Sequence, residues 1–141
     1  MRPEEHFNTM ATAGRGMLLS LFAVTEGATG LGLLVVPTVL LTLLLGPTLV
    51  APEEAVIARI FGAALLAIAA ASWGARNDNR RQGPLELLVG ITLYNCLATA
   101  IFVYSALVLK MIGILLWPAL LCHAATSMWS LLATWRAIRA G

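Results

Sequence analysis

The chain of 141 residues is 60% hydrophobic and only 11% charged, with a formal net charge of +2. A soluble domain carries roughly 25% charged residues, so this composition excludes an ordinary soluble domain. The small net charge gives no reason to expect a nucleic-acid partner. We therefore expect an integral membrane protein surrounded by the lipid bilayer. Four spans of about 20 residues each leave too little chain for a second folded domain, which predicts a single membrane domain over residues 1–141.

The first apolar stretch covers residues 17–45, which is longer than one span requires. Pro37 interrupts it, and a proline inside a helix removes a hydrogen bond and clashes with the preceding turn. We expect the first span over residues 17–36. Pro37 then either kinks this helix or starts a short interfacial helix over residues 38–45. The acidic start of the chain, followed by a full-length span, predicts that no signal peptide is cleaved.

Three further apolar segments follow this stretch. Pro52 stands at a suitable first helical position, with two glutamates in the first turn where the helix dipole favours negative charge. It predicts a second span over residues 53–75. After a polar loop we expect the third span over residues 85–109 and the fourth over residues 112–135. Together these segments predict an all-α, four-helix membrane bundle.

Basic residues gather on one side of the expected spans. Only Lys110 would lie on the side away from the two chain ends. The arginines on the side of the chain ends are Arg2, Arg15, Arg76, Arg80, Arg81, Arg136 and Arg139. Loops rich in Lys and Arg stay in the cytoplasm, so this distribution predicts a cytoplasmic N-terminus and a cytoplasmic C-terminus.

Three polar side chains fall near the middle of different spans: Glu26, Asn95 and His123. A lone carboxylate in hydrocarbon costs several kcal/mol, so we expect Glu26 to pair with Arg59 or His123, or to be protonated. Arg59 lies towards the outer end of the second span. These four residues form the candidate ligand or proton site. The alternative is a packing contact in which a Glu26–Arg59 pair only fixes the helix register.

Hydroxyl and aromatic side chains accompany this candidate site on the third and fourth spans. Spacings of three and four residues place the hydroxyls on one helix face, which we expect to point inward. Such hydroxyls either bond carbonyl groups of their own helix or line a hydrated or ligand-filled cleft. The expected lining residues are Tyr94, Thr99, Thr126, Ser127 and Ser130.

The sequence predicts no metal site and assigns no cofactor. Cys122 and His123 are consecutive, so they project about 100° apart on a helix and cannot easily bind one ion. Haem ligation by two histidines would need more than the single histidine expected within the spans. No GxSxG motif indicates a serine nucleophile.

The order of motifs in the first half of the chain resembles that of one protein family. Residues 27–32 read Gly-Ala-Thr-Gly-Leu-Gly, and Pro37, Leu45-Gly46-Pro47 and the segment Ala58–Leu66 follow. This order is similar to that of the small four-helix bacterial membrane proteins of the DoxX-like type. The resemblance implies a multi-pass protein, expected in the bacterial inner membrane, and it transfers no catalytic residue.

Three functions are compatible with these features. The first is an accessory subunit that packs in a larger membrane complex or a homo-oligomer, or that holds a lipid, a quinone or another hydrophobic molecule near Glu26, Asn95 and His123. The second is a proton-coupled small transporter that uses Glu26. The third is a membrane isomerase acting on a lipid-like substrate, with Glu26 and His123 as acid and base. We favour the first because the chain is short.

Overall fold

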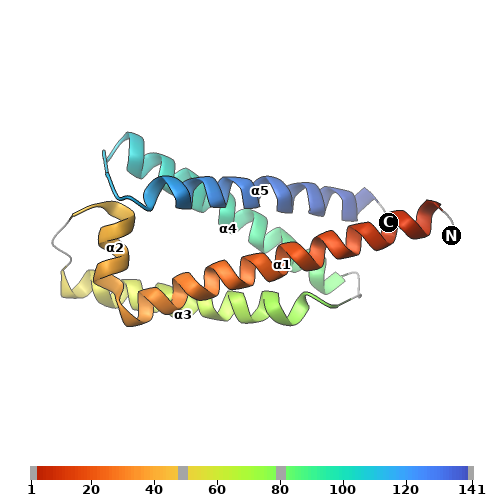
Figure 1. Cartoon of the computed structure of the whole chain (residues 1–141), viewed down its shortest axis with the longest axis horizontal. Coiled ribbons are helices and arrows are strands. Elements are labelled where there is room, and N and C mark those ends of the chain that lie inside the picture. The colour runs from red at the N-terminus through yellow and green to blue at the C-terminus, as the bar shows by residue number, and fades with distance from the viewer. Residues whose placement is uncertain (1–2, 48–50, 79–81, 140–141) are drawn as a thin grey trace.

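The computed structural model describes residues 3–47, 51–78 and 82–139, and within these ranges the chain is helical and contains no strand. This confirms the all-α prediction. The five helices are α1 (Pro3–Val35), α2 (Pro37–Leu45), α3 (Pro52–Ala75), α4 (Gln82–Leu107) and α5 (Leu116–Arg139). Figure 1 shows four long helices running side by side and α2 lying across one end of them. We call this end the α2 end, and the opposite end the terminal end.

Four of the helices are long and apolar enough to cross a membrane. At 1.5 Å per residue, a segment of 21 to 24 residues reaches about 32–36 Å, which matches a hydrocarbon core of about 30 Å. The four segments are Ala13–Val35, Pro52–Ala75, Leu85–Leu107 and Leu116–Arg136. The structure therefore agrees with the expected number of spans.

Several helix ends differ from the sequence-based prediction: α4 spans Gln82–Leu107 and not 85–109, α5 ends at Arg139 and not at 135, and two starts differ for a clear reason. Helix α1 begins at Pro3 and not near residue 17, because the polar segment before the apolar stretch continues the same helix. Helix α5 begins at Leu116 and not at residue 112. The preceding connection contains Lys110 in a left-handed conformation, with φ of 55°, which interrupts the helical path. Hydrophobicity marks the length of a span, whereas backbone conformation decides where a helix ends.

Pro37 starts a separate helix and does not merely kink α1. It is the first residue of α2, where its missing N–H costs no hydrogen bond. Gly46 ends α2 with φ of 108°, a conformation that favours glycine. The N–H of Leu115 donates to the carbonyl oxygen of Leu43 at 2.8 Å, so α2 is fastened to the connection between α4 and α5.

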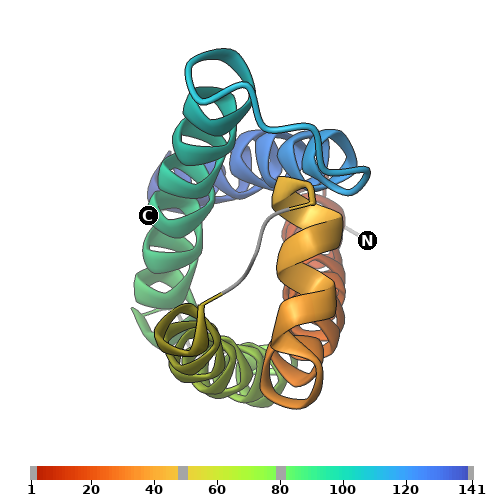
Figure 2. The same cartoon turned by 90° about the vertical axis from the view of Figure 1, so that its left-hand side faces the viewer.

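The four long helices form two pairs. Helix α1 packs mainly on α3, and α4 packs mainly on α5. Contacts between the pairs are fewer, and α3 touches α4 at only a few positions. Both views show α3 and α4 meeting near their short connection and diverging towards the α2 end (Figures 1 and 2). The side of the bundle between α3 and α4 is therefore the least closed.

Glycine allows the close approach of α1 and α3. A Cβ atom added at Gly30 would lie 2.7 Å from the carbonyl oxygen of Gly62, and one added at Gly62 would lie 2.6 Å from that of Gly30. Real Cβ atoms do not tolerate such distances. Small residues at a crossing let two backbones touch, which is a common way to join helices in a membrane.

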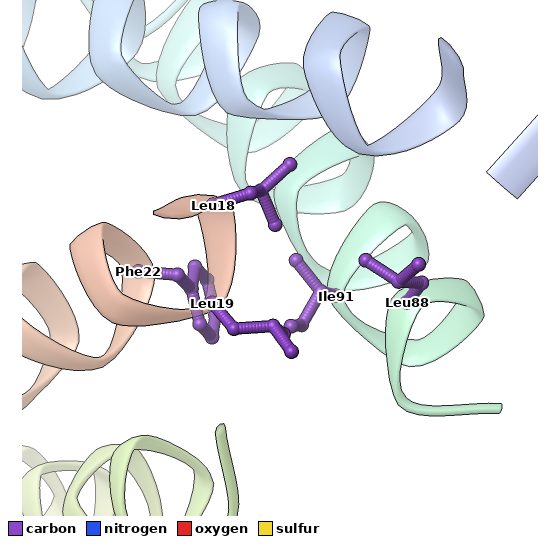
Figure 3. Close-up of a cluster of buried hydrophobic side chains, with 5 residues drawn as sticks. All are labelled: Leu18, Leu19, Phe22, Leu88 and Ile91. Carbon is purple, nitrogen blue, oxygen red and sulfur yellow. The ribbon is translucent and has the colours of Figure 1, made fainter. Parts of the chain in front are cut away.

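Two apolar clusters form the core: the first joins the helix pairs, and the second is built within the α1–α3 pair. Figure 3 shows the first, near the terminal end, where Leu18, Leu19 and Phe22 of α1 meet Leu88 and Ile91 of α4. The second lies towards the α2 end and is built around Leu33, Ala58 and Leu65. Tyr94 packs against both clusters, which places its ring between the two pairs.

Candidate functional site

Glu26 and Tyr94 connect the two helix pairs through a polar contact. The Glu26 side chain is buried, with 5% of its surface exposed. Its Oε2 atom accepts a hydrogen bond of 3.1 Å from the hydroxyl of Tyr94. Since Glu26 belongs to α1 and Tyr94 to α4, this bond crosses between the pairs. The bundle thus contains a buried carboxylate bound by a neutral donor.

Asn95 and His123 form a second polar contact, between α4 and α5. Asn95 is 1% exposed, and its Oδ1 lies 2.8 Å from Nδ1 of His123. Its Nδ2 donates to the carbonyl oxygen of Ile91 at 2.8 Å. The reverse orientation of the amide would set two carbonyl oxygens against each other, so the contact to Ile91 fixes which side faces the histidine. An amide oxygen only accepts, so Nδ1 of His123 is the donor.

Aromatic rings link these two contacts. The rings of Tyr94 and His123 meet edge to face, with centroids 5.6 Å apart. Phe22 meets Tyr94 in the same manner at 6.0 Å, and Phe102 lies 5.4 Å from His123. Such edge-to-face arrangements are favourable because a positive ring edge meets a negative ring face.

We define the polar cluster as the four side chains that the two hydrogen bonds join. Three helices contribute to it, and the two phenylalanine rings lie beside it. Its members are Glu26, Tyr94, Asn95 and His123.

The structure does not bring Arg59 to the polar cluster. Arg59 is exposed, and its Nε donates to the carbonyl oxygen of Leu34 at 3.2 Å. Leu34 lies eight residues after Glu26, which is about 12 Å along the helix. The last carbonyls of a helix lack partners and carry its negative dipole end, so Leu34 offers Arg59 a nearer acceptor. Of the alternatives expected for Glu26, the pair with Arg59 is not formed.

The expected lining hydroxyls are directed to the backbone of their own helices. Thr99 donates to the carbonyl of Asn95, and Ser127 to that of His123, each at 2.8 Å. Thr126 and Ser130 donate to carbonyl groups four and three residues earlier. Of the two alternatives, hydrogen bonding within the helix therefore holds for these four residues. Tyr94 differs because its hydroxyl bonds across to another helix.

Sequence reasoning missed the two phenylalanines and undervalued Tyr94. A periodic signal was present, because Phe22 precedes Glu26 by one helical turn and Phe102 follows Asn95 by two turns. Tyr94 was expected beside the site, yet it supplies the bond that joins α1 to α4. That role depends on which helices are neighbours, which the spacing alone does not reveal.

Metal ligands do not gather in the part of the chain that the structure describes. No group of three or more His, Cys, Asp or Glu side chains in these residues could hold an ion. Cys96 and Cys122 are exposed free thiols.

Comparison with known proteins does not assign the chain to a family. A scan against protein-family models and searches of curated proteins and of solved structures found no match. The resemblance to DoxX-like proteins therefore stays a prediction, and the function is argued from the polar cluster itself.

Proposed function

We propose that this chain is a multi-pass membrane protein that holds a hydrophobic molecule by its polar group at the polar cluster, and that it serves as an accessory, ligand-binding subunit. A bacterial inner membrane is the proposed location. Four helices of spanning length support this proposal.

Exposed apolar side chains support membrane insertion. On α4, Leu93, Leu97 and Ile101 recur every four residues, and each is more than half exposed. Monomeric soluble proteins rarely expose a continuous apolar surface of this kind. In a bilayer such a face meets acyl chains, or the matching face of a larger complex or a second copy.

Arginine and tryptophan side chains at the terminal end support cytoplasmic chain ends. The guanidinium of Arg76 lies 3.8 Å above the Trp73 ring, and that of Arg139 lies 3.9 Å above the Trp135 ring. Tryptophan favours the membrane interface, and arginine favours the cytoplasmic side. Lys110 lies in the connection at the α2 end.

The observation that carries the ligand-binding proposal is the buried contact of Glu26 with Tyr94 between the helix pairs. Polar groups within a membrane are costly, and those that face a bundle interior commonly serve a substrate or ion. Across the described residues, Glu26 forms no ion pair, so a salt bridge that only fixes helix packing does not explain its burial.

Native purification tests the proposal. The protein would be extracted directly into lipid nanodiscs, and bound small molecules would be identified by mass spectrometry. We expect a hydrophobic compound to accompany the wild type and to be depleted about tenfold or more from Glu26→Gln and Tyr94→Phe. Glu86→Gln, which changes an exposed glutamate on α4, is the matched control and should retain the compound.

Two results would contradict ligand binding at this site. One is a wild-type protein that carries only the bulk lipids of its membrane. The other is a specific compound that is retained equally by Glu26→Gln, Tyr94→Phe and the control. The elution volume of each variant in size-exclusion chromatography would show whether its fold is intact.

A further inference from the structure

With Glu26 ionised, the polar cluster has more free acceptors than free donors. Tyr94 gives its hydroxyl hydrogen to Glu26, His123 gives its Nδ1 hydrogen to Asn95, and Asn95 gives one amide hydrogen to Ile91. Within the described residues no hydrogen bond occupies the other oxygen of Glu26 or the Nε2 of His123. The phenolic oxygen of Tyr94 can also accept. The second amide hydrogen of Asn95 is the one donor left.

This inventory discriminates among hydrophobic ligands. A quinone or an ester lipid presents carbonyl oxygens, which need donors and would leave the free acceptors of the cluster unpaired. Unpaired buried polar groups weaken binding, so such ligands fit poorly. A ligand that donates hydrogen bonds matches the free oxygen of Glu26 and the free nitrogen of His123. The polar group of the ligand is therefore a donor.

The need of an ionised Glu26 for a positive partner narrows the class of ligand further. An ionised carboxylate in a membrane interior requires a partner of opposite charge. The nearby cation that the sequence offered, Arg59, is bound to the end of α1 at Leu34. The hydrogen bond from Tyr94 orients the Glu26 side chain but supplies no positive charge, so Glu26 is ionised only when a cation binds beside it. A cationic ligand would supply that charge.

The rings around the carboxylate suit a cation as well. Phe22 and Tyr94 meet beside Glu26, and Phe102 and His123 continue the aromatic surface. Ring faces attract ammonium groups, and the attraction is stronger where water is excluded. A buried carboxylate among aromatic rings is a combination that recognises organic cations.

We infer that the polar cluster binds an amphiphilic ammonium ion, meaning a protonated amine on an apolar body, with its nitrogen against Glu26. The inference rests on the proposed function and names the class of its ligand. His123 Nε2 accepts a second hydrogen from the ammonium group.

A matched pair of probes tests this inference. Dansylcadaverine carries a primary amine that is protonated at neutral pH, and N-acetyl-dansylcadaverine has the same fluorescent body without the charge. Binding to the protein in phosphatidylcholine nanodiscs would be followed by fluorescence, with empty nanodiscs as the background. We expect the wild type to bind the amine at least about tenfold more tightly than the acetylated probe. Glu86→Gln should behave as the wild type does.

Two substitutions examine the charge and the rings separately. Glu26→Gln should lower the affinity for the amine about tenfold or more and leave that for the acetylated probe unchanged. Phe102→Leu removes a partly buried ring and leaves Glu26 in place, so it remains informative if Glu26→Gln fails to fold. Phe102→Leu should lower the affinity for the amine several-fold and the affinity for the acetylated probe less, because a neutral group gains little from a ring face.

The outcomes distinguish this inference from the proposed function. If both probes bind equally and both are lost in Glu26→Gln or Tyr94→Phe, the ammonium inference is overturned while a hydrophobic-ligand site remains. If the binding of both probes is unaffected by every substitution in the cluster, the ammonium inference and the proposed site both fail. Amine binding that persists in Glu26→Gln overturns the inference even where the acetylated probe binds weakly.

Discussion

Asn95 determines which nitrogen of His123 is free. The Oδ1 of Asn95 accepts a hydrogen bond of 2.8 Å from Nδ1 of the imidazole. The bond from Asn95 Nδ2 to the Ile91 carbonyl prevents the amide from turning over. In a neutral ring, Nε2 is then the acceptor. Asn95 acts as a positioning residue because it reaches a ligand through the histidine it orients.

Replacing Asn95 should release this constraint. In the wild type, the ¹⁵N chemical shifts of His123 should report a neutral ring protonated at Nδ1. In Asn95→Leu, which keeps a similar volume, we expect a mixture of both tautomers and weaker amine binding, because Nε2 is no longer always the acceptor. Asn77→Leu, in an exposed turn, is the control and should leave both spectra and binding unchanged. An unaltered tautomer in Asn95→Leu would refute the positioning role.

The hydrogen bond between Tyr94 and Glu26 should contribute modestly to stability. Tyr94→Phe removes the hydroxyl and keeps the ring that packs on both apolar clusters. A double-mutant cycle with Glu26→Leu should give a coupling free energy of about 0.6 kcal/mol, the average for side-chain hydrogen bonds inside a membrane protein, and no more than about 1.7 kcal/mol. Reversible unfolding in mixed detergent and dodecyl sulfate micelles measures it. Tyr104→Phe, at an exposed position on α4, should change the free energy of unfolding little. A coupling near zero would mean that the contact does not persist in the folded protein.

The glycine crossing should tolerate no added methyl group. Gly30→Ala would bring a Cβ atom within 2.7 Å of a backbone oxygen of α3, so the two helices must separate. We expect the free energy of unfolding to fall by about 1–3 kcal/mol, the usual cost of overpacking. Gly90→Ala is the matched control because a Cβ atom at Gly90 meets nothing within 4 Å. Equal effects of the two substitutions would show that helix propensity, and not the crossing, sets the outcome.

Composition and periodicity predicted much of this architecture. The number of spans follows from apolar length, and in the structure the helix faces that turn inward consist of residues that recur every three or four positions. Ala58, Gly62, Leu65, Ala69 and Ser72 show this recurrence on α3, where all five are buried. The helix ends were predicted less well because hydrophobicity does not sense backbone conformation, as the left-handed Lys110 shows.

The sequence predicted the level of the candidate site residues within the membrane, but it did not predict all of their hydrogen-bond partners. The positions of Glu26, Asn95 and His123 along their spans indicated a common level, and the structure joins Asn95 to His123. The sequence could not show that Arg59 would donate to a free carbonyl at the end of α1, because α1 ends there only if Pro37 starts a new helix. It also could not show that α1 and α4 are neighbours, which gives Tyr94 its role.

Arg59 should therefore be dispensable for ligand binding. Arg59→Gln removes the cation and retains a donor for the Leu34 carbonyl, so the end of α1 keeps its cap. We expect the amine affinity of this variant to equal that of the wild type, in contrast to Glu26→Gln. The measurement is the nanodisc fluorescence titration. A loss similar to that of Glu26→Gln would show that Arg59 and Glu26 act together in solution.

The orientation of the chain can be tested with single cysteines. Both native thiols are exposed, so the background would carry Cys96→Ala and Cys122→Ala. Lys110→Cys then reports on the connection between α4 and α5, and Arg139→Cys on the last turn of α5. With cytoplasmic chain ends, a membrane-impermeant maleimide should label the former in intact spheroplasts and the latter only after lysis. The reverse pattern would invert the proposed topology. Equal labelling of both sites would indicate insertion in two orientations, against which the concentration of arginine at one end argues.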